Sequence, residues 1–65
     1  MTDFDYYIFF FERWLNYQFP RVEDNRQNFA ILEKVSQIVS DNDELTYWSD
    51  RDNWTMYYYA KELIK

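Results

Sequence analysis

The chain has 65 residues, a net charge of −5 and no cysteine, histidine or glycine. This length allows one domain, residues 1–65, that buries only about 60% of its unfolded surface, and the missing cysteine excludes disulfides and thiolate metal sites. The negative charge argues against direct binding to nucleic acid or to an anionic membrane, and the apolar N-terminal run is too short and too charged to span a bilayer, so we expect a soluble, cytoplasmic protein without a cofactor.

The first helix is predicted over residues 3–17, with Thr2 and Asp5 at the spacing of an N-terminal capping pair. Because the run YYIFFF also has high β-propensity, a strand over residues 4–11 stays open. Two apolar stripes run along the predicted helix. The core face is Phe4, Tyr7, Ile8, Phe11 and Leu15, and the second stripe is Tyr6, Phe10, Trp14 and Tyr17.

The second helix is predicted to begin near Asp24, after the single proline at position 20, and Asp24 and Gln27 have capping spacing. Its apolar residues follow the pattern of an amphipathic helix that buries one face. The core face of this helix is Ile31, Leu32, Val35, Ile38 and Val39.

The third helix is predicted to begin between Ser49 and Asp52 and to run to the C-terminus, and a short extra turn is expected before it in DNDELTYW. The predicted fold is therefore all-α, a compact three-helix arrangement with a short extra helical turn between helices 2 and 3. The core face of the third helix is Met56, Tyr57, Ala60, Leu63 and Ile64.

Catalysis and metal binding are both disfavoured by the residue types present. Without histidine, cysteine and glycine the chain lacks the commonest general base, the thiolate nucleophile and glycine-rich phosphate loops. Asp50 and Asp52 form a carboxylate pair, but acids at a helix start are usually caps. The segment from Asp41 resembles the opening of a calcium loop, yet it has Leu45 and Thr46 at the fifth and sixth positions. We predict neither an enzyme nor a metal site.

An acidic segment with aromatic neighbours is the main candidate for a binding surface. Residues 41–52 hold five acids and one base, which accounts for −4 of the net charge of −5. Tryptophan and tyrosine with a polar rim are typical of binding hot spots. The alternative is that the acids cap helices and that Trp54 and Tyr58 stack on the first helix. The predicted partner-binding residues are Asp41, Asp43, Glu44, Tyr47, Trp48, Asp50, Asp52, Trp54 and Tyr58.

The aromatic content exceeds what a small core can enclose. Sixteen aromatic residues present about 3,200 Å² of side chain, so some must lie on the surface or in an interface. The leading hypothesis is a small interaction module that inhibits or regulates a basic target, such as a nucleic-acid-binding enzyme, as a DNA mimic of the kind phages use in the host cytoplasm. The alternative is an obligate homo-oligomer, such as a homodimer, or a subunit of a larger assembly. A helix-turn-helix reader of DNA is opposed by the charge.

The segment TYWSDRDN, residues 46–53, and the predicted helix after it resemble the paired aromatics, acidic turn and helix of the colicin DNase immunity proteins. Those proteins are acidic helical inhibitors, so the resemblance implies that the chain blocks an enzyme by docking on it. It also implies that Tyr47 and Trp48 take the place of the tyrosine pair that contacts the nuclease. The chain lacks the glycine- and proline-bearing details of that family and is too short for its four-helix fold.

Overall fold

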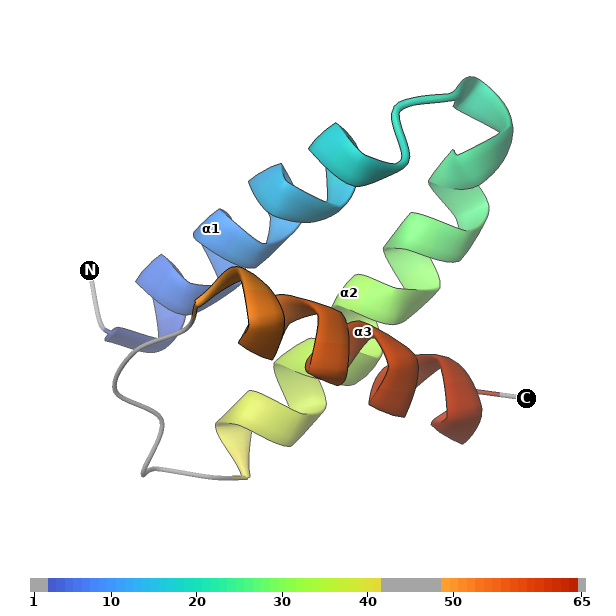
Figure 1. Cartoon of the computed structure of the whole chain (residues 1–65). Helices are drawn as coiled ribbons and strands as arrows, with labels where there is room; N and C mark the ends of the chain where they lie inside the picture. Colours follow the sequence, from blue (N-terminus) through green and yellow to red (C-terminus); the bar gives the residue numbers. More distant parts are fainter. Residues whose placement is uncertain (1–2, 42–48, 65) are drawn as a thin grey trace.

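The computed structural model describes residues 3–41 and 49–64. They form the helices α1 (Asp3–Gln18), α2 (Asn25–Ser40) and α3 (Asp50–Leu63), with a single 3-10 turn, η1 (Val22–Asp24), before α2 (Figure 1). No strand forms within these two ranges. The all-α prediction is confirmed, and residues 4–11 are helical.

The extra helical turn, η1, lies between α1 and α2. The sequence placed such a turn between the second and third helices, and that prediction falls on residues 42–48, which lie outside the described residues. Arg21 has extended backbone angles and its carbonyl accepts a hydrogen bond from the Asp24 amide at 2.9 Å. Because η1 runs directly into α2, Asp24 is already helical, and its side chain makes no capping hydrogen bond among the described residues. The predicted cap by Asp24 is therefore wrong.

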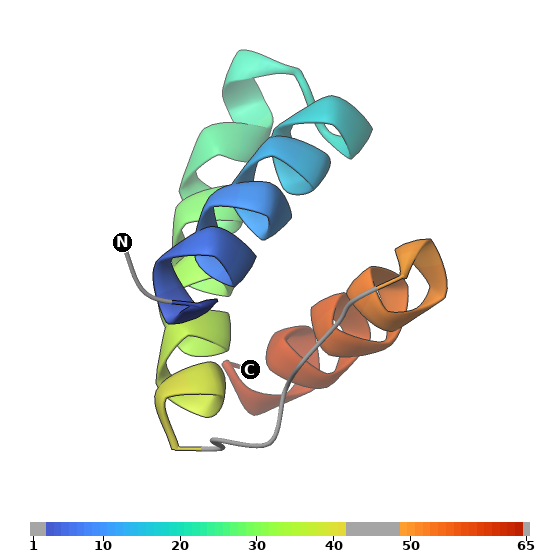
Figure 2. The same ribbon diagram turned by 90° about the vertical axis from the view of Figure 1, so that its left-hand side faces the viewer.

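α1 and α2 lie side by side and run in opposite directions, and α3 crosses the same side of both (Figures 1 and 2). α2 therefore packs against both of the other helices. No helix in the described part of the chain is long and apolar enough to cross a membrane.

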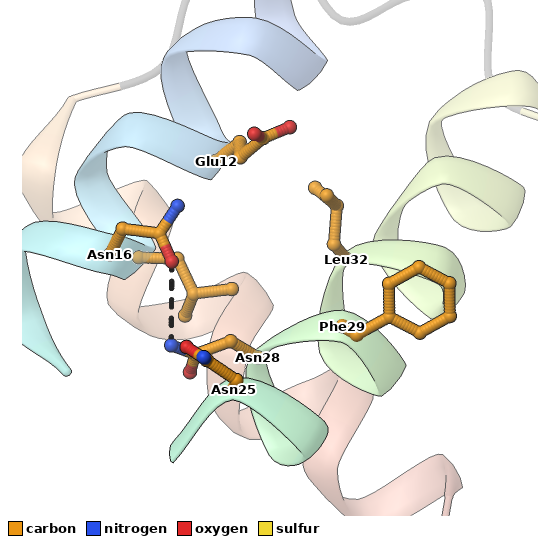
Figure 3. Close-up of a pocket in the computed structure, with 7 residues that line it drawn as sticks. Glu12, Asn16, Asn25, Asn28, Phe29 and Leu32 are labelled. Carbon is orange, nitrogen blue, oxygen red and sulfur yellow. Dashed lines mark hydrogen bonds between the residues drawn. The ribbon is translucent and has the colours of Figure 1, made fainter. Parts of the chain in front are cut away.

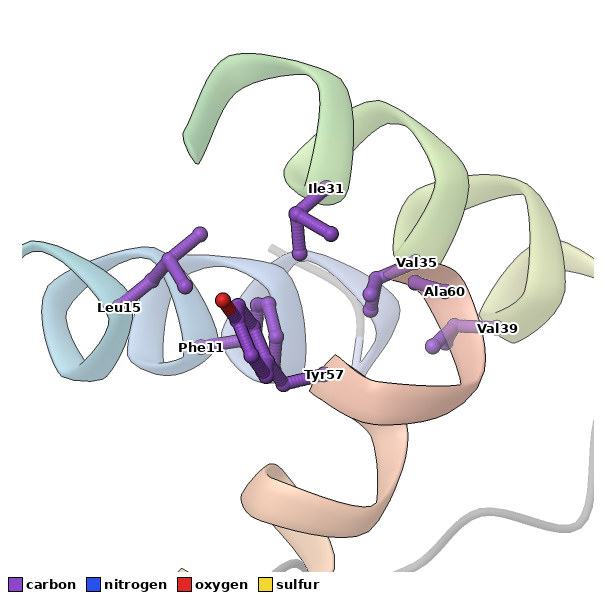
Figure 4. Packing of buried hydrophobic residues seen from close by; sticks show 7 residues of the cluster. All are labelled: Phe11, Leu15, Ile31, Val35, Val39, Tyr57 and Ala60. Atoms are coloured by element: carbon purple, nitrogen blue, oxygen red, sulfur yellow. The ribbon is translucent and has the colours of Figure 1, made fainter. Parts of the chain in front are cut away.

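The core lies where the three helices meet (Figure 4). Each large apolar side chain that it buries contributes about 1.5–3 kcal/mol relative to an exposed position. The predicted core faces of the first two helices are confirmed for the buried residues of α1 and α2 given below, and Leu32 and Ile8 pack partly buried beside them. The buried side chains are Phe11 and Leu15 of α1, Ile31, Val35 and Val39 of α2, and Tyr57 and Ala60 of α3.

The predicted core faces are wrong at the ends of α1 and α3. Leu63 and Ile64 are 49% and 39% exposed, because α3 crosses α2 and its last turn projects beyond it (Figure 1). Phe4 is 37% exposed in the first turns of α1. Helical periodicity assigns a residue to a face, but the length of the partner helix decides how much of that face is covered.

Candidate functional site

The predicted acidic residues are distributed over separate parts of the fold. Asp41 follows the last turn of α2, whereas Asp50 and Asp52 lie in the first turn of α3, and these two ends lie apart in both views (Figures 1 and 2). The described structure therefore does not bring Asp41 together with the other two acids, although all three are exposed. Asp43, Glu44, Tyr47 and Trp48 lie outside the described residues.

Asp52 has a structural role at the beginning of α3. Ser49 and Asp52 form a capping box, in which the Asp52 amide donates to Ser49 Oγ at 3.3 Å and the Ser49 amide donates to Asp52 Oδ2 at 3.0 Å. Ser49 Oγ also donates to the same carboxylate at 3.0 Å. The hydrogen bond from the Ser49 backbone, followed by the one from its side chain, lowers the pKa of Asp52 below its ordinary value of 3.8. The capping interpretation holds for this acid.

The capping box predicts a pH-dependent stability. Replacing Ser49 by alanine is expected to lower the free energy of unfolding by about 1 kcal/mol.

Asp52→Asn should destabilise the chain at neutral pH, because the folded state lowers the pKa of Asp52. This stabilisation is complete above the unfolded pKa of 3.8 and is lost as the pH falls through the lower folded value. Urea unfolding at several pH values measures the difference in the free energy of unfolding between the wild type and Asp52→Asn. Asp41→Asn is the control for removing one exposed negative charge. It should not lower the free energy of unfolding at neutral pH, because Asp41 follows the C-terminus of α2, where the helix dipole disfavours negative charge.

Asp50 joins α3 to α1. Trp14 Nε1 donates a hydrogen bond to Asp50 Oδ1 at 2.7 Å, and the Trp14 ring packs edge to face on Trp54 with centroids 4.9 Å apart. The Trp54 ring stacks in turn on Tyr58 at 5.9 Å. Asp50, Trp54 and Tyr58 recur every four residues, so they share one flank of α3. We call Trp14, Asp50, Trp54 and Tyr58 the acidic–aromatic flank.

The acidic–aromatic flank rests on further rings that hold it in place. Phe19, just past α1, stacks on Tyr57 at 5.0 Å and meets the edge of Trp54 at 6.1 Å. Tyr57 is buried, and its hydroxyl accepts a hydrogen bond from Gln27 Nε2 at 2.9 Å. Trp54 is half-buried, whereas Tyr58 is 59% exposed. Trp54 therefore packs on the α1 side of the fold, as the alternative interpretation expected, and Tyr58 leaves an aromatic ring at the surface.

Trp14 is the flank residue that sequence reasoning missed as part of the site. The sequence placed it with Tyr6, Phe10 and Tyr17 in the second stripe of the first helix. The structure turns Trp14 toward α3 instead, while the other three remain 50–82% exposed. The expected stacking of Trp54 on the first helix pointed to an aromatic residue of that helix. It did not identify Trp14, because 36 positions separate Trp14 from Asp50 and no local sequence pattern connects the two.

A cavity of about 180 Å³ opens between α1 and α2 (Figure 3). On its polar side, the buried Asn28 donates from Nδ2 to the Phe19 carbonyl at 2.9 Å and to Asn16 Oδ1 at 3.5 Å. These bonds fasten the end of α1 to α2. The residues that line the cavity are Glu12, Leu15, Asn16, Asn25, Asn28, Phe29 and Leu32.

Within residues 3–41 and 49–64, no group of three or more His, Cys, Asp or Glu residues could hold a metal ion.

Comparison with protein-family models, with curated proteins and with solved structures finds no match for this chain.

Proposed function

We propose that the chain is a small acidic protein-interaction module that docks its acidic–aromatic flank on a basic partner and so inhibits or regulates it. The observation that supports this function is the exposed Asp50 carboxylate, which the Trp14 indole holds at 2.7 Å beside the Trp54 and Tyr58 rings. An arginine of a partner pairs with a carboxylate and stacks on aromatic faces. The flank offers both kinds of contact in one place.

The rigidity of the flank favours tight binding. Trp54 has ring contacts with Trp14, Phe19, Tyr57 and Tyr58, so its side chain is already fixed before a partner arrives. Binding by preorganised side chains avoids part of the conformational entropy cost of association. Tryptophan and tyrosine are also the residues most enriched among binding hot spots.

The charge distribution supports a basic partner. The net charge of the chain is −5, and two exposed carboxylates, Asp50 and Asp52, lie in the first turn of α3. A negatively charged chain attracts a positively charged surface over a distance, which raises the association rate.

A nucleic-acid-binding enzyme is the partner class that this surface fits best. A carboxylate beside flat rings offers the chemistry of a phosphate beside a base, and single-stranded nucleic acid is bound through backbone charge and base stacking. Occupying such a groove would block the enzyme without any chemistry by the chain itself. This is the mode of action of a DNA mimic.

The test uses variants that alter the flank and leave the helices intact. A partner captured from a lysate on the immobilised chain is purified, and its binding kinetics are measured at increasing salt. Asp50→Asn keeps an oxygen to accept from Trp14 but removes the charge, so association should slow and its salt dependence should flatten. Tyr58→Ala should weaken binding about tenfold.

The matched control is Glu33→Gln, which removes one exposed charge from α2. It should leave the affinity for the captured partner unchanged and have a smaller effect on the association rate than Asp50→Asn. Association that does not respond to salt, or equal rates for Asp50→Asn and Glu33→Gln, would rule out docking through the flank.

A further inference from the structure

α1 carries a second aromatic surface, away from the acidic–aromatic flank. Its rings are substantially exposed, and they recur along the side of the helix opposite the buried Phe11 and Leu15. We call this surface the α1 aromatic face. It consists of Tyr6, Phe9, Phe10 and Tyr17, which are 50%, 53%, 56% and 82% exposed, together with Arg13.

The N-terminal rings of the face form a connected surface. Phe10 stacks on Tyr6 with ring centroids 6.2 Å apart, and the edge of Phe9 meets Phe10 at 5.7 Å. The guanidinium of Arg13 lies 5.9 Å from the centre of the Phe9 ring. The face is therefore apolar with one positive charge, whereas the chain as a whole is negative.

The area of the face matches one half of a small dimer interface. At the exposed fractions given above, its four rings present about 500 Å², the size of patch that marks an interaction site on a small protein. Two copies of the face would bury about 1,000 Å² together, which is the lower limit for a specific interface. The neighbouring backbone and the Arg13 side chain add to that area.

We propose that two copies of the chain pair antiparallel through the α1 aromatic face. A two-fold symmetric interface requires that one patch contact itself, and the spacing of this face allows it. When the symmetry axis passes between Phe11 and Glu12, Tyr6 of each copy lies opposite Tyr17 of the other. Arg13 then lies opposite Phe10, so each guanidinium covers a ring of the second copy as it already covers Phe9 in its own.

This inference goes beyond the proposed function, because the dimer uses α1 and the basic partner uses the flank. Trp14 belongs to the flank and is turned toward α3, where it contacts Trp54 at 4.9 Å. The paired module would present two flanks at once. A target with two binding sites within reach would then be held by avidity.

Sedimentation equilibrium over a range of chain concentrations tests the pairing. The wild-type chain should shift from one to two copies as concentration rises. Phe10→Glu should raise the dimer dissociation constant about 30-fold. The matched control is Phe29→Glu on α2, where the phenylalanine is 64% exposed but lies outside the face, and it should dimerise like the wild type. A wild-type chain that stays monomeric at its highest attainable concentration, or equal effects of the two substitutions, would overturn the proposal.

Single cysteines test the antiparallel register, because the chain has no cysteine of its own. A mixture of Tyr6→Cys and Tyr17→Cys chains should form a crossed disulfide under mild oxidation. The Tyr17→Cys chain alone should not, because its two thiols would be about 16 Å apart along the helix axes, beyond the reach of a disulfide. Rapid disulfide formation by Tyr17→Cys alone would instead indicate parallel helices. Far-ultraviolet circular dichroism checks that each variant folds.

Discussion

Phe11→Ala is expected to lower the free energy of unfolding by about 3–5 kcal/mol, the usual cost of removing a buried phenylalanine. Phe11 is 1% exposed and lies in the cluster where the three helices meet (Figure 4). The Trp14 ring packs beside it, with ring centroids 5.4 Å apart. The loss combines the missing apolar contact with the cavity left behind. A domain of this size has a total stability of about 3–5 kcal/mol, so the variant should be largely unfolded at room temperature.

The neighbouring phenylalanine provides the control for Phe11→Ala. Phe10 is 56% exposed, so Phe10→Ala should change stability by less than about 0.5 kcal/mol. Urea unfolding followed by circular dichroism compares the two variants, at a chain concentration low enough that the proposed pairing does not contribute. Equal losses for both variants would mean that α1 is rotated about its axis relative to the described packing.

Asn28→Asp exchanges the side-chain amide for a carboxyl group, and this small change is expected to lower the free energy of unfolding strongly. Asn28 is 5% exposed and lies beside Asn16 between α1 and α2 (Figure 3). Its Nδ2 donates to the Phe19 carbonyl at 2.9 Å. An aspartate at this position loses the donor and places a buried negative charge against a carbonyl oxygen. Leaving a buried charge without compensation costs about 3–5 kcal/mol, comparable to the stability of the whole domain.

The pH dependence of Asn28→Asp identifies the cause of the loss. Burial raises the pKa of the introduced carboxyl, so its folded value lies above the unfolded value of about 3.9. The variant should therefore approach wild-type stability at low pH and lose stability as the pH rises past the unfolded value. The control is Asn25→Asp, at an exposed residue that lines the same cavity. A deficit at position 28 that did not change with pH would show that shape rather than charge is responsible.

The helices could be predicted from the sequence because their signals are local. Ile31, Val35 and Val39 follow one another at helical spacing, and all three are buried. The same periodicity overestimated the burial of Leu63, which is 49% exposed at the end of α3. Whether a residue at the end of a helix is buried depends on where the helices cross and how far they overlap. Periodicity carries no information about either.

The site could be predicted only in part. The recurrence of Asp50, Trp54 and Tyr58 every four residues places them on one flank of a helix, and that much is readable in advance. Which ring of the first helix meets this flank depends on how the helix is rotated about its axis. The second stripe offered four aromatic candidates, Tyr6, Phe10, Trp14 and Tyr17. The tertiary packing selects Trp14 for the contact with Trp54.

The edge-to-face contact of Trp14 with Trp54, at 4.9 Å, provides an optical signal that exists only in the assembled fold. Two indoles held in fixed orientation contribute to near-ultraviolet circular dichroism, whereas a loosely packed state keeps its helices but loses that signal. Far-ultraviolet circular dichroism then reports the helices, and near-ultraviolet circular dichroism reports the packing of α3 on α1. The two spectra therefore distinguish helix formation from tertiary packing without an added label.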